Sequence, residues 1–178
     1  MTGFRFCRVR PIVVAVALMA TASVIDAAPL PGGSSSLMET YDDWSVVCQV
    51  RSDVTSCAAR QVQTSKQTNQ TVLAIEILGT AKDKLSGFLL LPLGLALAEG
   101  ARFKIDDGAA EAAVAFTTCL PQGCVVPLDL GADVTARLRV GKTLTINIVA
   151  TDTAKPLALP VSLKGFANAL DRVSDLTK

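Results

Sequence analysis

Cysteines are the residues of this sequence whose spacing most directly indicates chemistry. In "TTCLPQGC", 117–124, four residues separate Cys119 from Cys124, and eight separate Cys48 from Cys57. Thiols in such pairs could bind a metal, exchange electrons or form disulfides. The two pairs do not both have the short spacing of zinc sites, and the sequence contains no histidine. Neither forms the C-x-x-C motif of thiol oxidoreductases, so structural disulfides are the expectation.

The residues between Cys119 and Cys124 suit a tight turn. Pro121 has a fixed φ, and Gly123 tolerates backbone conformations that other residues avoid. A four-residue loop centred on them puts the two cysteines directly across from each other. A disulfide there contributes about 2–3 kcal/mol by the chain-entropy estimate for short loops.

The other cysteine pair lies in two segments with the pattern of strands. In "WSVVCQV", two-residue alternation places Trp44 and Cys48 on the same face. The polar loop "RSDVTS" follows, and "CAARQVQ" indicates a returning strand. If the loop folds symmetrically, Cys48 lies opposite Cys57, where the two Cβ atoms are within reach of a disulfide.

The first 28 residues have the pattern of an export signal. A basic amino end precedes the apolar run "IVVAVALMA", which is too short to span a bilayer and has the length of a signal-peptide core. Small residues follow, so we expect cleavage between Ala22 and Ala28. Cys7 lies before the apolar run and leaves with the signal. Four cysteines remain, and an even number in an oxidising compartment indicates disulfides.

The rest of the chain has the composition of one exported globular domain. Removing residues 1–28 takes away three of the 17 Lys and Arg and one of the 16 Asp and Glu, which leaves a net charge of −1. Nucleic-acid binders carry clustered basic residues, so that class is excluded. We expect a flexible linker over 29–40, one domain over 41–178 and no stable transmembrane segment once the signal is removed.

Hydrophobic patterning predicts the fold class. The pattern indicates further strands over 71–78, 101–105, 111–119, 143–150 and 156–163. Four-residue apolar spacing indicates short helices within 131–141 and 165–176. We therefore predict an all-β fold, a two-sheet antiparallel β-sandwich with one or two short helices, stapled by two disulfides.

Residue types that common catalytic sites need are missing. Without histidine there is no Ser-His-Asp, Cys-His or His-based metal site. Gly141-Lys142-Thr143 lacks the earlier glycine of a phosphate-binding loop and precedes a strand, so no nucleotide binding is expected. Asp106 and Glu111 are carboxylates that could serve a hydrolase. We expect no catalytic residue, no metal site and no cofactor.

One apolar stretch could form a binding surface. Residues 89–100 contain more apolar side chains than one half-buried strand needs, and Pro92 and Gly94 prevent a single long strand. The stretch either lies wholly in the core or exposes an apolar patch at Leu93 and Leu95. Such patches often mark partner sites.

Five segments, in this order, resemble the invasion-associated locus B family. They are "DWSVVC", "CAARQ", "LLLPLGLALAEGARFKIDDG", "FTTCLPQGC" and "PVSLKGFANAL", and the similarity extends from Trp44 to about Leu170. Family members are small exported proteins of Gram-negative bacteria. The resemblance implies a β-sandwich with disulfides Cys48–Cys57 and Cys119–Cys124. It implies no catalytic residue.

These features predict an exported, non-catalytic envelope protein that acts as a binding or host-interaction module. Its location would be periplasmic or secreted, with outer-membrane association left open, and its partner an unknown envelope or host protein. Two alternatives remain: an exported carboxylate-dependent hydrolase and an inhibitor of an exported enzyme. The hydrolase requires that Asp106 and Glu111 converge in a cleft.

The export signal makes a prediction about the mature amino end. Because the basic region and apolar run should direct cleavage at the small residues that follow, the protein from its native host should begin between Ser23 and Pro29. Amino-terminal sequencing measures this directly. An intact Met1 in the cytosolic fraction would contradict the prediction and remove the basis for expecting oxidised cysteines.

Overall fold

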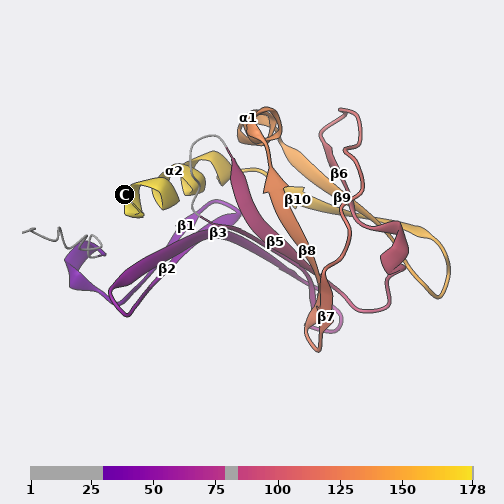
Figure 1. The fold of residues 1–178 in the computed structure, drawn as a ribbon, viewed down its shortest axis with the longest axis horizontal. Helices are drawn as coiled ribbons and strands as arrows, with labels where there is room; N and C mark the ends of the chain where they lie inside the picture. The colour runs from indigo at the N-terminus through magenta and orange to yellow at the C-terminus, as the bar shows by residue number, and fades with distance from the viewer. Residues whose placement is uncertain (1–29, 79–83, 178) are drawn as a thin grey trace, which may run out of the picture.

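The computed structural model describes residues 30–78 and 84–177, whose arrangement is shown in Figure 1. Within these residues, ten strands form two antiparallel sheets, and two α-helices complete the fold. The predicted all-β, two-sheet architecture is confirmed. The predicted signal peptide, 1–28, lies outside the described residues.

The larger sheet has seven strands in the order β1-β2-β3-β4-β5-β8-β7. Its burial follows the two-residue period of a strand: in β2, Trp44, Val46 and Cys48 are buried, and the residues between them face outward. The strands are β1 (Ser36–Tyr41), β2 (Trp44–Arg51), β3 (Val54–Thr64), β4 (Thr71–Leu78), β5 (Leu85–Leu91), β7 (Thr118–Leu120) and β8 (Gly123–Leu130).

The smaller sheet has three strands in the order β10-β9-β6, which are β6 (Arg102–Ile105), β9 (Thr143–Val149) and β10 (Pro156–Ser162). Leu144, Ile146 and Ile148 of β9 are buried on one face, as their alternation predicts. Strand β10 lies at the sheet edge, which its prolines favour because proline has no N–H to donate to a second neighbour.

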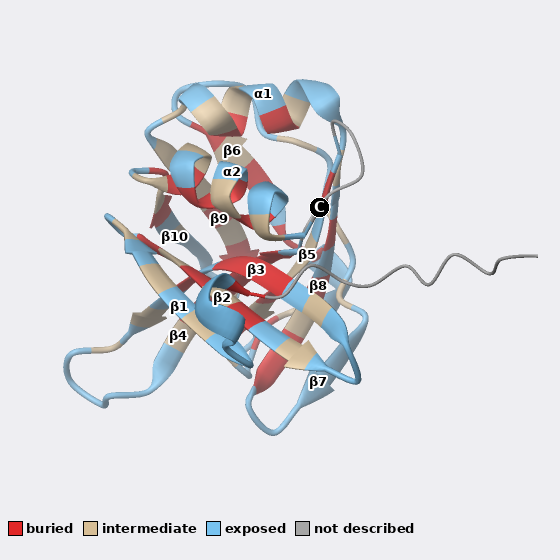
Figure 2. Cartoon of the chain, turned by 90° about the vertical axis from the view of Figure 1, so that its left-hand side faces the viewer, coloured by how far each residue is buried: buried red, intermediate tan, exposed pale blue. Residues whose placement is uncertain are grey.

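Two helices cover parts of the sheets. Helix α1 (Ala132–Val140) connects β8 to β9, and helix α2 (Phe166–Leu176) packs against β1, β2 and β3. Phe166, Leu170 and Val173 of α2 are buried, which confirms the apolar face predicted for this segment. Figure 2 shows α2 above the strands of the larger sheet, with buried residues where the layers meet. One core therefore joins both sheets and α2.

Two disulfides cross neighbouring strands of the larger sheet. Cys48 of β2 pairs with Cys57 of β3, and Cys119 of β7 pairs with Cys124 of β8. In both cases the two residues are direct partners in the strand register. The predicted stapling of the fold by two disulfides is thus confirmed. Cys48 and Cys57 lie in the core, whereas Cys119 is exposed.

The predicted flexible linker over 29–40 is wrong for the residues that the structure describes. Leu30 is buried, and β1 pairs with β2 from Ser36 opposite Gln49 to Tyr41 opposite Trp44. The error has a physical reason. An edge strand is held by backbone hydrogen bonds and needs few apolar side chains, so the small and polar residues of this segment gave no strand pattern. The folded unit begins before residue 41.

The strand predicted over 111–119 is also wrong for most of its length. Strand β7 covers Thr118–Leu120, and the residues before it make isolated bridges, Lys104 with Ala110 and Ala101 with Val114. The segment is rich in alanine, whose small side chain gives a sheet little to pack. It runs as an irregular connection along the smaller sheet.

Helix α2 is fixed to strand β1 by a bidentate ion pair. Arg172 donates two hydrogen bonds to the Glu39 carboxylate, each 2.8 Å long, and the Tyr41 hydroxyl donates a third. The bonds from Arg172 lower the pKa of Glu39 below its usual value. Burial, and then the bond to Glu39, raise the pKa of Tyr41. The ionised carboxylate is therefore favoured in the folded state.

The two disulfides should contribute unequally to stability. Replacing Cys48 and Cys57 together with alanine should lower the free energy of unfolding by about 2–5 kcal/mol, because it removes the cross-link and disturbs the core. Replacing Cys119 and Cys124 together should cost less, since that bridge closes a shorter loop and is partly at the surface. Urea unfolding measures both, and an equal or larger loss for the second pair would contradict this ranking.

The Glu39 ion pair should make stability depend on pH. A carboxylate whose pKa is lowered by folding stabilises the protein above its unfolded pKa, and that contribution is lost as the pH falls through the folded pKa. The stability difference between the wild type and Glu39→Gln should therefore be full at pH 7 and shrink below the ordinary glutamate value of 4.5. Asp171→Asn, at the more exposed pair with Arg139, is the matched control and should change stability less. A Glu39→Gln difference that stays constant down to pH 3 would contradict this assignment.

Candidate functional site

The two carboxylates of the hydrolase alternative do not converge. The Asp106 side chain accepts hydrogen bonds from the backbone N–H groups of Lys142 and Thr143, at 3.0 and 2.9 Å. Glu111 instead faces a different depression, where it pairs with Arg137. The N–H groups of the Gly-Lys-Thr segment are thus engaged by the protein's own carboxylate. Asp106 acts here as a turn-stabilising residue.

The two leucines of the predicted apolar patch have different positions. Leu93 is 57% exposed, whereas Leu95 is 7% exposed and bridges to Ala150 beside the smaller sheet. Gly94, between them, has a positive φ of 85°, a conformation that turns the chain and that residues with a Cβ rarely adopt. The stretch therefore places one leucine in the core and the other at the surface.

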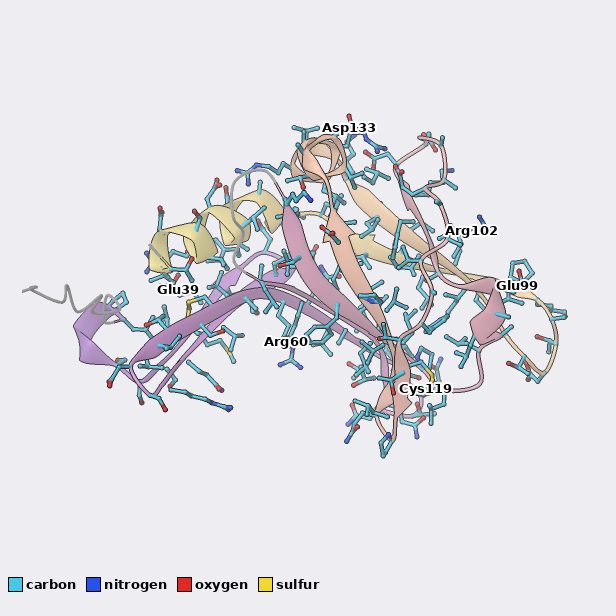
Figure 3. The ribbon with its side chains drawn as sticks, in the orientation of Figure 1. Glu39, Arg60, Glu99, Arg102, Cys119 and Asp133 are labelled. Atoms are coloured by element: carbon cyan, nitrogen blue, oxygen red, sulfur yellow. A yellow bond between two sulfur atoms is a disulfide. The ribbon has the colours of Figure 1, made fainter. Side chains whose placement is uncertain are left out.

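Two further leucines are exposed, one in the same stretch and one in the neighbouring β7–β8 hairpin. Leu97 begins the short 3-10 helix η2 (Leu97–Glu99), two residues after Leu95. Leu120 lies in the stapled β7–β8 hairpin, whose Cys124 is the register partner of Leu91. We call the exposed residues Leu93, Leu97 and Leu120 the leucine end. Figure 3 shows Cys119 and Glu99, neighbours of these residues, on the lower and right-hand sides of the ribbon.

A cavity of ≈ 190 Å³ lies between the two sheets and the two helices. The larger sheet contributes Ile75, Ile77 and Leu128 to its wall, and the smaller sheet contributes Phe103 and Ile105. Trp44, Leu138 and Phe166 close the inner end, and all three are buried. The deep part of the cavity is therefore lined by apolar side chains.

The rim of this cavity is polar and acidic. Glu111 and Ala112, from the connection after β6, form one side, and Asp129 and Gly131, before α1, form another. Arg137 of α1 bonds to Glu111 and also to Asp133 at 3.1 Å, so an ion pair joins the two sides. The bond to Glu111 is the main cause that raises the pKa of Arg137. The guanidinium stays charged and already has two carboxylate partners.

Sequence patterns did not indicate this cavity. Its walls come from residues far apart in the chain, which the alternation within single strands cannot relate to one another. Glu111 was singled out, but for acid–base chemistry rather than for a rim ion pair, and Arg137 was not singled out at all. A lone arginine on a short helix carries no signal of its distant partner.

The described residues offer no group of three or more His, Cys, Asp or Glu side chains that could hold a metal ion. None of the helices in residues 30–78 and 84–177 is long and apolar enough to cross a membrane. The chemical features that the described structure provides are thus an apolar cavity with an acidic rim and exposed leucines. Figure 3 shows Asp133 of α1, which bonds to the rim arginine, at the top, and Cys119 of the β7–β8 hairpin at the bottom.

The chain has relatives of known name. It is 49% identical over 152 residues to an invasion protein B homolog of Brucella abortus (strain 2308), covering 85% of this chain and 87% of that protein. It is 33% identical over 153 residues to invasion protein B of Bartonella bacilliformis, covering 85% and 82%.

A solved structure also matches. The crystal structure of invasion associated protein b from Bartonella henselae superposes with a TM-score of 0.74 and is 34% identical, covering 79% of this chain and 97% of that one. The model of the invasion associated locus B (IalB) protein family matches residues 44–174. The resemblance noted in the sequence is confirmed, and the chain belongs to the invasion associated locus B family.

Proposed function

We propose that this protein is exported to the bacterial envelope or beyond and works there as a non-catalytic binding module. The leucine end is the observation that carries the proposal, because exposed leucine side chains offer an apolar contact for a partner. The partner is an envelope or host-cell protein. That curated relatives are named invasion protein B is consistent with a contact outside the cytoplasm.

The disulfides support the compartment. Disulfides persist in oxidising environments such as the periplasm and the cell exterior and are rare in reducing cytosol. In this chain both bridges join adjacent strands, and they include every cysteine of the mature sequence. A cell compartment that reduced these bonds would remove a stabilising contribution from a small domain.

The hydrolase alternative has less support. A pair of catalytic carboxylates must face the same scissile bond, typically at about 5–10 Å from each other. Asp106 is occupied by two backbone N–H groups, and Glu111 is held by Arg137 at the rim of a different depression. Neither carboxylate is free to act on a shared substrate. Inhibition of an exported enzyme would use the same leucine end and is one form of the binding function.

The leucine end should be required for partner association but not for folding. The double variant Leu93→Ser, Leu97→Ser removes two exposed apolar side chains, so the folded protein should keep its thermal midpoint. Its association with envelope fractions or host cells should fall by about tenfold, as expected for the loss of central apolar contacts. Sedimentation with envelope fractions and a cell-binding assay measure this.

The control variant is Val140→Ser, which removes a side chain that is 85% exposed on helix α1, away from the leucine end. It should leave association unchanged. Equal association of the wild type and the double variant would reject the leucine end as the contact. Hydrolysis of glycan or peptide substrates that Asp106→Asn or Glu111→Gln abolishes in folded protein would reject the non-catalytic function itself.

A further inference from the structure

The cavity between the sheets has the properties of a small-molecule site. Its volume of ≈ 190 Å³ exceeds that of an engineered cavity of about 150 Å³ that stays dry and binds benzene. Its wall is built from Ile, Leu, Val, Phe and Trp side chains of both sheets and both helices. A cavity of this size accommodates one ring or a short alkyl chain.

Water is a poor occupant of the deep part of the cavity. A buried water needs two to four polar partners, whereas side chains such as Ile75, Phe103 and Leu138 offer none. An empty cavity, in turn, deprives its lining of dispersion contacts that a close-packed interior would provide. An apolar guest restores these contacts and removes its own apolar surface from water, so binding is favoured on both counts.

The cavity has a polar opening through which such a guest could keep a polar end in solvent. Exposure rises from the inner wall to the rim: Trp44 is 1% exposed, Val134 is half-buried, and Ala112 and Gly131 are exposed. The rim connection is bonded to β6 through its backbone, where the Glu111 N–H donates to the Phe103 carbonyl oxygen at 2.7 Å. The arrangement suits a ligand with one apolar body and one polar end.

The rim charges discriminate between polar ends. Glu111 and Asp129 line the opening, and Asp133 is joined to Glu111 through Arg137, whose one positive charge is shared between these two carboxylates. A carboxylate at the rim would be repelled by these negative charges at short range. A hydroxyl or an amine would not meet this repulsion.

From these observations we infer that the cavity binds a small amphiphile, with an apolar body the size of one ring or a short alkyl chain and a neutral or amino polar end. The lining of this site includes none of the residues of the leucine end, and the inference does not depend on the proposed partner-binding function.

Trp44 provides a direct readout of occupancy. It is the only tryptophan of the sequence, its ring lines the inner end of the cavity, and its Nε1 donates to the carbonyl oxygen of Ser162 at 2.8 Å. Its fluorescence therefore reports on the cavity without a label. The test is a titration of the purified, oxidised mature protein with 1-hexanol, hexylamine and hexanoate, followed by Trp44 emission and by the thermal midpoint.

Hexanol and hexylamine should each produce a saturable change in emission, with a Kd of about 1 mM or lower, and should raise the thermal midpoint because they bind the folded state. Hexanoate should bind several-fold more weakly. Asp129→Asn removes one negative charge of the rim at an exposed position. It should therefore reduce the difference between the Kd values of hexylamine and hexanoate.

Two variants test the location. Val134→Phe fills the cavity from α1, and Ala112→Phe obstructs the opening from an exposed position where folding is not at risk; each should weaken hexanol binding by at least about tenfold. Val140→Phe, on the same helix but outside the lining, is the matched control and should bind as the wild type does.

Three results would overturn the inference. No saturable emission change with hexanol or hexylamine would show that the cavity is a packing defect without a guest. A change that survives Ala112→Phe in folded protein would place binding elsewhere. Hexanoate binding as tightly as hexylamine would show that the acidic rim does not select between polar ends.

Discussion

The structure depends on the close approach of two turns, the β1–β2 turn and the corner between β10 and α2. Trp44, after the first turn, packs its ring against Phe166 with centroids 4.8 Å apart and donates to the Ser162 carbonyl. Gly165 permits the contact: a Cβ there would lie 2.0 Å from the carbonyl oxygen of Tyr41, and its φ is +85°. The Lys164–Asp42 ion pair adds a link at the surface.

This junction explains why one core includes both sheets and α2. Because Trp44 belongs to the larger sheet while Ser162 and Phe166 belong to β10 and α2, one side chain fixes the relative position of three layers. The same ring forms the inner wall of the cavity. The cavity therefore lies where the larger sheet, the smaller sheet and α2 meet, and where the same side chains must pack against all three. Such points are difficult to fill completely.

The sequence predicted those parts of the fold that depend on local pattern. The alternation around Trp44 and in β9, the helix that starts near Phe166 and the turn between Cys119 and Cys124 were all found, because each is encoded within a few residues. Strand β1 was missed because its pairing uses the backbone. Leu93 and Leu95 could not be told apart, since their burial is decided by the bridge to Ala150 and the turn at Gly94.

Both disulfides are local, and this affects how the protein can acquire them. The four cysteines of the described residues permit three pairings, and a wrong one must be reshuffled through mixed disulfides on a slow timescale. Here each cysteine joins the next one along the chain, 9 and 5 residues away, within a single hairpin. If the chain met an oxidant amino end first, Cys48 and Cys57 would be exposed to it before the second pair. Oxidation in order of appearance would give the native pairing without reshuffling.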